Sequence, residues 1–380
     1  MIIFISCVTF LLFTGLPATS AFVSSASSSF TYTSRSCLGA HGGASVEINS
    51  TKLMHVPSVS SLPPFSVYLL DMWGVMHDGS RPYPGVVDTI SELKSLGKKL
   101  VILSNSSKRL SYAESMLIKL GFDENDFEQI ITSGEISWQM LAGNDKLQCK
   151  KWSVLAKLLK DASKKVFVFG SGDNDEEYVE TAGWTLAPVS EADLILSRGT
   201  FTINSGRGEV ISKNVDGEDT YFAAHDEVLK IAAERRLPML VSNPDRIRPS
   251  PDDGFPPMPG AIGDAYENAL GNGDVAEELV KRIGKPHEEV YEIALAGIDV
   301  NDSNVVMVGD ALETDIMGGV ANGVATLWVV NDGVHGPEVA ENGGNEGGGT
   351  EHMVQSFNDR KGFTNEIAIR PTFVTPHFNW

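Results

Sequence analysis

Continuous apolar runs that stop abruptly at polar residues mark the expected buried strands of this chain. Residues 67–70 are wholly apolar and stop at Asp71, and a second run covers residues 99–103. Apolar residues at helical spacing follow each run, at residues 86–96 and 110–120, and a glycine ends both segments. Because the order is strand, helix, strand, helix, the pattern predicts a parallel sheet with right-handed crossovers.

The middle of the chain repeats this alternation and predicts a second α/β unit inserted into the first. Strands are expected at residues 165–169, 193–196 and 239–241, and helices at 220–235 and from 261, after a proline-rich loop at 249–260.

The tail returns to the opening pattern. We expect a helix at residues 287–297 with Pro286 at its first position, a strand at 304–308, a helix at 312–322 and a strand at 324–330. The glycine-rich stretch 342–349 is expected to be a mobile loop, and residues 370–380 to pack back on the core.

These patterns divide the chain into four expected parts and define its fold class as α/β. They are a presequence at residues 1–50, a core domain in two parts at 60–130 and 283–380, and an inserted domain at 131–282.

Length and charge narrow the classes of function. The 380 residues suffice for about two domains and an extension. The formal charge of -20 argues against a nucleic-acid binder and against a protein that binds anionic membranes, because both need a basic face. A small anionic substrate held by one lysine and backbone N–H groups stays compatible with this charge.

The first residues have the composition of targeting segments. Residues 2–13 are almost wholly apolar but too short to span a bilayer comfortably, and residues 23–46 are rich in serine and contain no acid. Cleavage after this region would leave Cys149 as the one cysteine, which suits a reducing compartment. We therefore expect plastid import through a bipartite presequence, with no membrane insertion after processing. Simple secretion is the alternative.

Polar residues with suitable chemistry follow several expected strands. Asp71 and Ser104 follow the first two, and Asp310 follows a late one, with Asp315 five residues further on. The carboxyl ends of parallel strands form the ligand crevice of an open α/β sheet. Clustered carboxylates repel one another, and a hard cation such as Mg²⁺ removes that cost. Lys285 can neutralise both a carboxylate nucleophile and a transferring phosphoryl group.

Taken singly, each of these residues has an ordinary structural interpretation. Asp71 and Asp310 could be turn residues, Ser104 a helix cap, Lys285 a surface lysine and Asp315 an acid on a helix face. Their order along the chain favours a common site.

With these residues in place, the sequence resembles the haloacid dehalogenase superfamily of aspartate-nucleophile phosphotransferases, over about residues 60–335. The motifs that match are Leu70-Asp71-x-x-Gly74-Val75, Ile102-Leu103-Ser104-Asn105, Gly284-Lys285-Pro286 and Gly309-Asp310-x₄-Asp315. Three further segments resemble the branch with a type-2 cap, subfamily IIA, which includes nitrophenyl and nucleotide phosphatases: Ile131-Thr132-Ser133-Gly134-Glu135, Ser242-Asn243-Pro244-Asp245 and Met258-Pro259-Gly260-Ala261.

The resemblance implies a Rossmann-like core with an inserted α/β cap, and a role for each site residue. Asp71 would attack phosphorus to form an aspartyl-phosphate, which water would then hydrolyse. Ser104, Asn105 and Lys285 would bind the substrate, and Ser104 and Lys285 would also take part in catalysis. Mg²⁺ would be held by Asp71, Asp310 and the backbone carbonyl of Trp73, with Asp315 close behind.

One position departs from the family's pattern. Phosphatases of this family place a second aspartate two residues after the nucleophile as general acid and base, and here that residue is Trp73. An indole cannot give a proton to a leaving alkoxide, and such help is typically worth ~10²–10⁴-fold. Aryl or acyl phosphates need less protonation of the leaving group. His77 and Asp78 are nearby candidates for a substitute acid.

Three hypotheses follow. The first is a Mg²⁺-dependent phosphatase that acts on a small phosphorylated metabolite. The second is a binding or regulatory protein on the same fold that turns over little, because Trp73 replaces the acid. The third, a metal-free dehalogenase, is disfavoured by the pair Asp310 and Asp315.

Overall fold

The computed structural model of the chain describes residues 53–380, apart from gaps at 144–151, 162, 207, 209, 249–254, 299, 301–303 and 365–366. The expected presequence at 1–50 and Cys149 lie outside the described residues. Within the described part of the chain, no helix combines the length and the apolar character needed to cross a bilayer.

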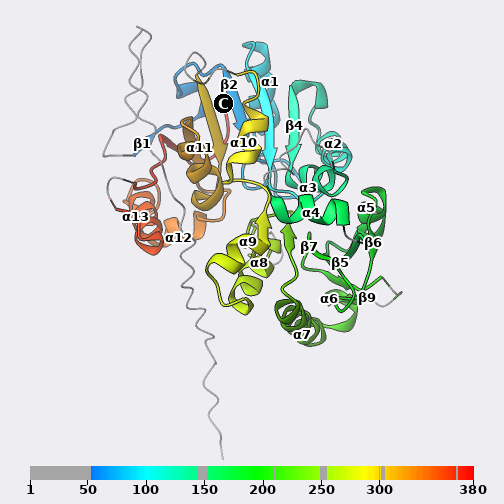
Figure 1. Cartoon of the computed structure of the whole chain (residues 1–380). Coiled ribbons are helices and arrows are strands. Elements are labelled where there is room, and N and C mark those ends of the chain that lie inside the picture. Colours follow the sequence, from blue (N-terminus) through cyan, green and yellow to red (C-terminus); the bar gives the residue numbers. More distant parts are fainter. Residues whose placement is uncertain are drawn as a thin grey trace, which may run out of the picture.

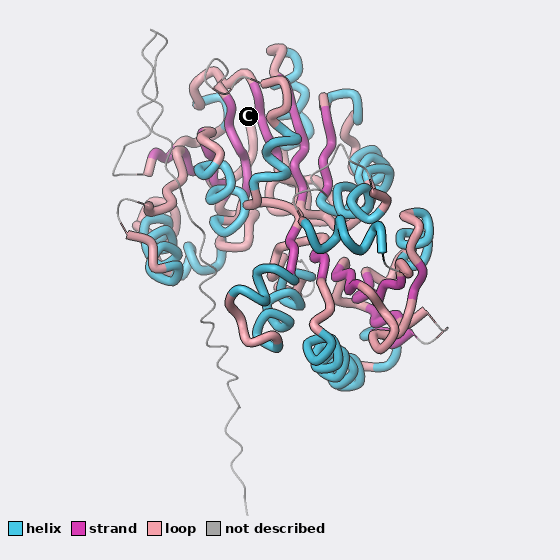
Figure 2. Tube along the Cα trace, viewed as in Figure 1, coloured by secondary structure: helices cyan, strands magenta, loops and turns pink. Residues whose placement is uncertain are grey.

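The core domain is built on a parallel sheet of seven strands (Figures 1 and 2). Their order across the sheet is β1 (Met54–His55), β14 (Phe373–Thr375), β13 (Ala325–Val329), β12 (Val305–Gly309), β2 (Val67–Leu70), β3 (Lys99–Ser104) and β4 (Gln129–Thr132). Every pairing is parallel, as the sequence predicts.

Strand β2 lies between β12 and β3, and all four of its residues are buried. Tyr68 and Leu70 belong to one hydrophobic cluster with helix α1 (Val86–Ser95), whereas Val67 and Leu69 pack in another with α3 (Ser133–Leu141) and α10 (Glu288–Ala294). Helices thus cover both faces, which explains why the strand has an unbroken apolar sequence.

The inserted cap domain has its own sheet, drawn in green in the lower part of Figure 1. Its order is β11 (Val280–Arg282), β10 (Met239–Val241), β7 (Leu194–Ser197), β5 (Lys165–Gly170), β8 (Thr202–Asn204) and β9 (Val210–Ser212), with β6 (Thr185–Leu186) paired to β5. The β5–β8 and β8–β9 pairings are antiparallel, and the other pairings are parallel.

The remaining helices connect these strands. They are α2 (Leu110–Lys119), α4 (Ser153–Asp161), α5 (Asp175–Thr181), α6 (Lys213–Asp216), α7 (Glu218–Arg235), α8 (Pro259–Ala269), α9 (Asp274–Leu279), α11 (Met317–Ala321), α12 (Gly336–Glu341) and α13 (Gly349–Lys361), with short 3₁₀ turns η1 (Val59–Ser61) and η2 (Glu124–Asp126). One cluster of buried apolar side chains continues from Leu69 of the core to Val168 of the cap.

Several expected boundaries need correction. The core sheet includes β1, before residue 60, and the expected cap start at 131 falls inside β4. Helix α10 begins at Glu288, because a turn from Gly284 to His287, closed by a 2.9 Å hydrogen bond from the His287 N–H to the Gly284 carbonyl, contains Pro286.

Two further expectations concern the tail. The helix expected at 312–322 is divided into a π-helical turn, η4 (Leu312–Ile316), and α11. The glycine-rich stretch forms a hydrogen-bonded turn between α12 and α13, with the Gly344 N–H bonded to the Val339 carbonyl at 2.8 Å. The expectation that residues 370–380 pack on the core is confirmed, because β14 pairs with β13 and Phe378 is fully buried.

Candidate active site

Asp71 lies at the carboxyl end of β2 and contacts Lys285 directly. Its N–H continues the pairing of the sheet by bonding the carbonyl of Val308 at 2.9 Å. Lys285 Nζ donates to Asp71 Oδ1 at 2.5 Å, and both residues are buried. Burial raises the pKa of the Asp71 carboxyl, and the adjacent Lys285 opposes that rise. The pair therefore places the Asp71 carboxyl group next to a fixed positive charge, which favours its ionised form against the effect of burial.

Lys285 serves two carboxylates. Its Nζ lies 2.7 Å from Asp315 Oδ1 in addition to its contact with Asp71. Burial opposes the charge on Lys285, but Asp315 and Asp71 outweigh it and hold the pKa of Lys285 above its usual value. Its backbone is fixed from the core side, because the Lys285 N–H donates to Asn105 Oδ1 at 2.7 Å. Lys285 is thus charged and immobile.

Asp310 and Asp315 complete a cluster of three buried acids with Asp71. Carboxylate oxygens of the three residues all lie within 4.8 Å of one another. Asp315 Oδ2 accepts hydrogen bonds from the N–H groups of Asp310 and Ala311, both at 3.1 Å, which fixes its side chain at the end of β12. Burial, followed by the charges of Asp315 and Asp71, raises the pKa of Asp310. Gly74 gives Asp310 its space, since a Cβ at Gly74 would lie 2.4 Å from Asp310 Oδ2.

This cluster fits a divalent metal. When ionised, the three carboxylates carry more negative charge than Lys285 can compensate, and their oxygens are the donors that Mg²⁺ prefers. Trp73 lies two residues after Asp71, in a loop where its backbone forms a bridge to His77.

Ser104 ends β3, the strand next to β2. The register pairs Leu70 with Ile102, so Asp71 and Ser104 follow neighbouring strands at the same edge. The Ser104 side chain is buried, and its Oγ accepts a hydrogen bond from the Ser106 N–H at 3.2 Å. This position suits the predicted contact with a phosphoryl group.

Asn105 has a different place from the one expected of a substrate ligand. Its Nδ2 donates to the Lys285 carbonyl at 3.1 Å and to Asp245 Oδ1 at 2.8 Å, while its Oδ1 accepts from the Lys285 N–H. These contacts suit a residue that positions Lys285 better than one that binds substrate.

Asp245 is a site residue for which no role was predicted from the sequence. It follows β10 of the cap and reaches the core through Asn105. Burial raises its pKa to about 6, while the hydrogen bond from Asn105 and the charge of Lys285 oppose the rise. The motif Ser242-Asn243-Pro244-Asp245 was a visible signal, but nothing in it indicated contact with the core.

Trp73, at the position of the family's acid, is partly buried. Its ring meets the His77 ring edge-on at 5.2 Å between centroids. A Cβ at Gly79 would lie only 2.0 Å from the Trp73 ring, so the glycine is needed there. The Arg248 guanidinium lies over the same ring, 4.6 Å from its centre. Trp73 is therefore held in the loop after Asp71, where its ring contacts Arg248 of the cap.

Neither candidate for a substitute acid is suited to the role. His77 is fully buried, its Nδ1 accepts from the Gly79 N–H at 2.9 Å, and burial lowers its pKa to about 4. For Asp78, burial raises the pKa, but hydrogen bonds from Ser80 and Arg81 outweigh it and lower the value to about 2. At neutral pH, His77 is neutral and buried and Asp78 is ionised.

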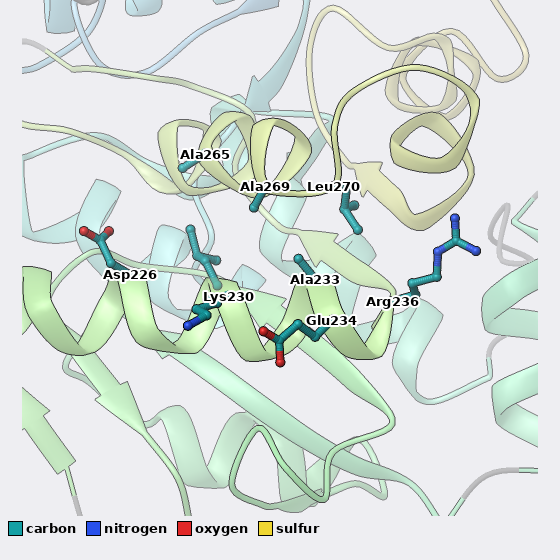
Figure 3. A pocket seen from close by; sticks show the side chains of 9 residues that line it. Asp226, Lys230, Ala233, Glu234, Arg236, Ala265, Ala269 and Leu270 are labelled. Atoms are coloured by element: carbon teal, nitrogen blue, oxygen red, sulfur yellow. The ribbon is translucent and has the colours of Figure 1, made fainter.

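A separate surface hollow of about 550 Å³ lies on the cap, where α7 and α8 run side by side (Figure 3). None of its lining residues belongs to the cluster around Asp71. They are Asp226, Leu229, Lys230, Ala233, Glu234, Arg236, Ala265, Ala269 and Leu270.

Comparison with known proteins agrees with this geometry. A family model described as haloacid dehalogenase-like hydrolase matches residues 68–185, and one described as HAD-hydrolase-like matches residues 282–360. The chain belongs to the haloacid dehalogenase-like hydrolases, and the prediction of this family and fold is confirmed. The expected enzyme class, phosphoric monoester hydrolase, is confirmed at the level of the family.

Individual relatives place the chain in the branch with nitrophenyl phosphatases, subfamily IIA. It is 28% identical over 258 residues to 4-nitrophenylphosphatase of Schizosaccharomyces pombe, which covers 66% of this chain and 78% of the relative. The solved structure of p-nitrophenyl phosphatase from Archaeoglobus fulgidus is 25% identical, with a TM-score of 0.52 and coverage of 83% and 97%. A haloacid dehalogenase-like hydrolase from Brucella suis 1330 shares the fold, at 19% identity, a TM-score of 0.59 and coverage of 85% and 99%.

Proposed function

We propose that the chain is a Mg²⁺-dependent phosphatase that acts on a small phosphorylated metabolite through an aspartyl-phosphate on Asp71. The observation that supports this most is the contact of one buried lysine with two carboxylates, Asp71 and Asp315, beside a third, Asp310. The similarity to nitrophenyl phosphatases agrees with a phosphoester substrate.

In this mechanism an Asp71 carboxylate oxygen attacks phosphorus, and the bond from phosphorus to the leaving oxygen breaks. Lys285 holds Asp71 in place and offsets the negative charge of the phosphoryl group. The Ser104 hydroxyl donates to a phosphoryl oxygen. A water molecule then attacks the acyl phosphate, which releases phosphate and restores Asp71.

Asp71, Asp310 and the Trp73 carbonyl would hold Mg²⁺, with Asp315 close behind. When bound, Mg²⁺ supplies positive charge that stabilises the phosphoryl oxygens in the transition state.

The direct test is a screen of phosphate esters with the full chain, with and without Mg²⁺, beside Asp71→Asn. Phosphate release that needs Mg²⁺ and is lost in the variant is the expected result. Equal release by both proteins would exclude Asp71 as nucleophile.

Trp73 supports one alternative, a phosphometabolite-binding protein that turns over little. Calorimetric titration of the esters that the screen finds unreactive tests it. Tight binding without turnover of aryl phosphates would favour the binding protein.

We also propose plastid import, on the composition of residues 1–46 alone. A fluorescent protein fused after residue 50 should enter plastids in an alga with secondary plastids. Its appearance in the medium would favour secretion.

A further inference from the structure

Trp73 replaces the general acid of the family's pattern, and its ring is held in place. It lies two residues after the nucleophile, and its ring is confined by His77 on one edge and by Gly79. The backbone bridge between Trp73 and His77 fixes the loop as well. The indole is therefore confined in the loop that follows Asp71, and it has no acidic proton to give.

Arg248 is held over this indole by the cap. The segment that follows β10 contacts the core at two points, through Asp245 on Asn105 and through Arg248 on Trp73. A guanidinium over an indole face is a favourable cation–π arrangement, which keeps the charge at that place. Its five N–H donors can serve more than one partner.

Arg248 adds a positive charge next to the Trp73 ring. The chain carries a formal charge of -20, and three acids surround the reaction centre. An oxygen that leaves phosphorus as an anion would be repelled by those acids, and a fixed guanidinium offsets this repulsion.

We propose that Trp73 and Arg248 together form a platform for the leaving group, which suits the enzyme to esters whose oxygen leaves as a stabilised anion, namely aryl and acyl phosphates. The inference rests on the proposed phosphatase function. As the bond from Asp71 to phosphorus forms, the bond to the leaving oxygen breaks and its electron pair stays on that oxygen. The product departs as a phenolate or carboxylate beside Arg248. A basic phenolate takes a proton later from water, whereas a carboxylate stays ionised at neutral pH.

The test is a series of substituted phenyl phosphates and one alkyl phosphate, measured as kcat/KM with the full chain and Mg²⁺. For the wild type we expect kcat/KM to fall steeply as the pKa of the leaving group rises. The kcat/KM of the nitrophenyl ester should exceed that of the alkyl ester by at least about 10²-fold, which is the size of the contribution that a general acid makes. Trp73→Asp should flatten this dependence.

Arg248→Gln separates the proposed role from a structural one. A more basic leaving oxygen carries more charge. The loss of kcat/KM in this variant should therefore grow as the pKa of the leaving group rises, from severalfold to at least about tenfold. A role only in holding Trp73 would lower all esters equally. Arg248→Lys should restore part of the loss. Arg246→Gln is the matched control, because Arg246 lies in the same segment and pairs with Asp264 on the cap.

Asp245 is the rival explanation, as an acid supplied by the cap. If Asp245→Asn leaves the dependence on leaving group unchanged, the inference holds, and if it makes the dependence steeper, Asp245 is the acid and the inference is wrong. A shallow dependence in the wild type, or a uniform loss in Arg248→Gln, also overturns it. No turnover of any ester overturns the proposed function itself. Thermal melting of each variant confirms that it is folded.

Discussion

Two buried carboxylates, each of which follows a strand of one of the two sheets, have opposite surroundings. In the core, Asp71 follows β2 and shares Lys285 with Asp315, next to Asp310. In the cap, Asp175 begins α5 just after β5 and forms an ion pair with Arg198, which is 2% exposed. Both carboxylates lie where open α/β sheets bind ligands.

The cap pair is balanced in charge, and the carboxylate of Asp175 accepts several hydrogen bonds. Asp175 accepts from the N–H groups of Ser171 and Gly172 and from the Thr202 hydroxyl, in addition to Arg198. One acid and one base balance each other there, whereas the core cluster has three acids and one lysine. The difference indicates that a buried carboxylate is structural when its partners satisfy it and reactive when they do not.

Asp71→Asn should produce the largest effect, on activity. The amide is a poor nucleophile, so we expect kcat to fall by at least about 10⁴-fold. The free energy of unfolding of the metal-free protein should not fall, because one of three crowded acids loses its charge. Steady-state kinetics and urea unfolding measure the two quantities.

A matched change at Asp310 extends this test. Asp310→Asn should reduce activity while Mg²⁺ at high concentration restores part of it. Recovery of Asp71→Asn by added Mg²⁺ would contradict its assignment as nucleophile.

Asp175→Asn should have the converse effect, on stability. The variant leaves Arg198 buried with an uncompensated charge, which costs roughly 3–5 kcal/mol of unfolding free energy. Urea unfolding measures this loss, and kcat per folded molecule should stay unchanged. The control is Asp173→Asn, an exposed acid paired with Lys108, expected to cost at most about 1 kcal/mol. A loss of activity with unchanged stability would make Asp175 a functional residue.

The sequence predicted the core cluster better than the cap. Unbroken apolar runs locate the ends of β2 and β12, so Asp71 and Asp310 could be placed together from pattern alone. Lys285 was placed with these acids because of its charge, and the family resemblance supported that placement, because a single Gly-Lys-Pro is not specific. The antiparallel strands β8 and β9 were missed because they are three residues long and include polar residues, unlike the equally short but wholly apolar β10.

The contacts between cap and core could not be predicted. Asn105 and Asp245 are 140 positions apart, and no local pattern relates them. The same is true of Trp73 and Arg248. The acidic stretch around Asp175 was visible, but its burial against Arg198 depends on packing between β5 and β7.

His77 adds a third buried titratable group to the comparison of Asp71 and Asp175, and it is neutral at pH 7. Its pKa is lowered from 6.5 to about 4 by burial, so as pH falls the unfolded chain takes up a proton before the folded one does. Stability should therefore fall between about pH 6.5 and pH 4, by about 3 kcal/mol in total. Urea unfolding across this range measures it.

His77→Asn removes the titration and keeps an acceptor for the Gly79 N–H. The free energy of unfolding of this variant should therefore lack the part of the fall at acid pH that comes from His77. His352→Asn, at an exposed position on α13, is the control for loss of a histidine. Equal slopes for the wild type and His77→Asn would show that His77 is not the group responsible.

Binding of Mg²⁺ is the smallest effect and the most direct test of the difference between the clusters. A ligand that binds only the folded state at 100 times its Kd stabilises by about 2.7 kcal/mol, so Mg²⁺ should raise Tm by several degrees. The rise should disappear in Asp310→Asn, since the carboxylate of Asp310 lies within 4.8 Å of its neighbours' oxygens. Asp175→Asn should melt earlier but keep the full rise, because the cap pair is already neutral and has no place for a cation. A rise that survives in Asp310→Asn and disappears in Asp175→Asn would place the metal in the cap and reverse the assignment of the two clusters.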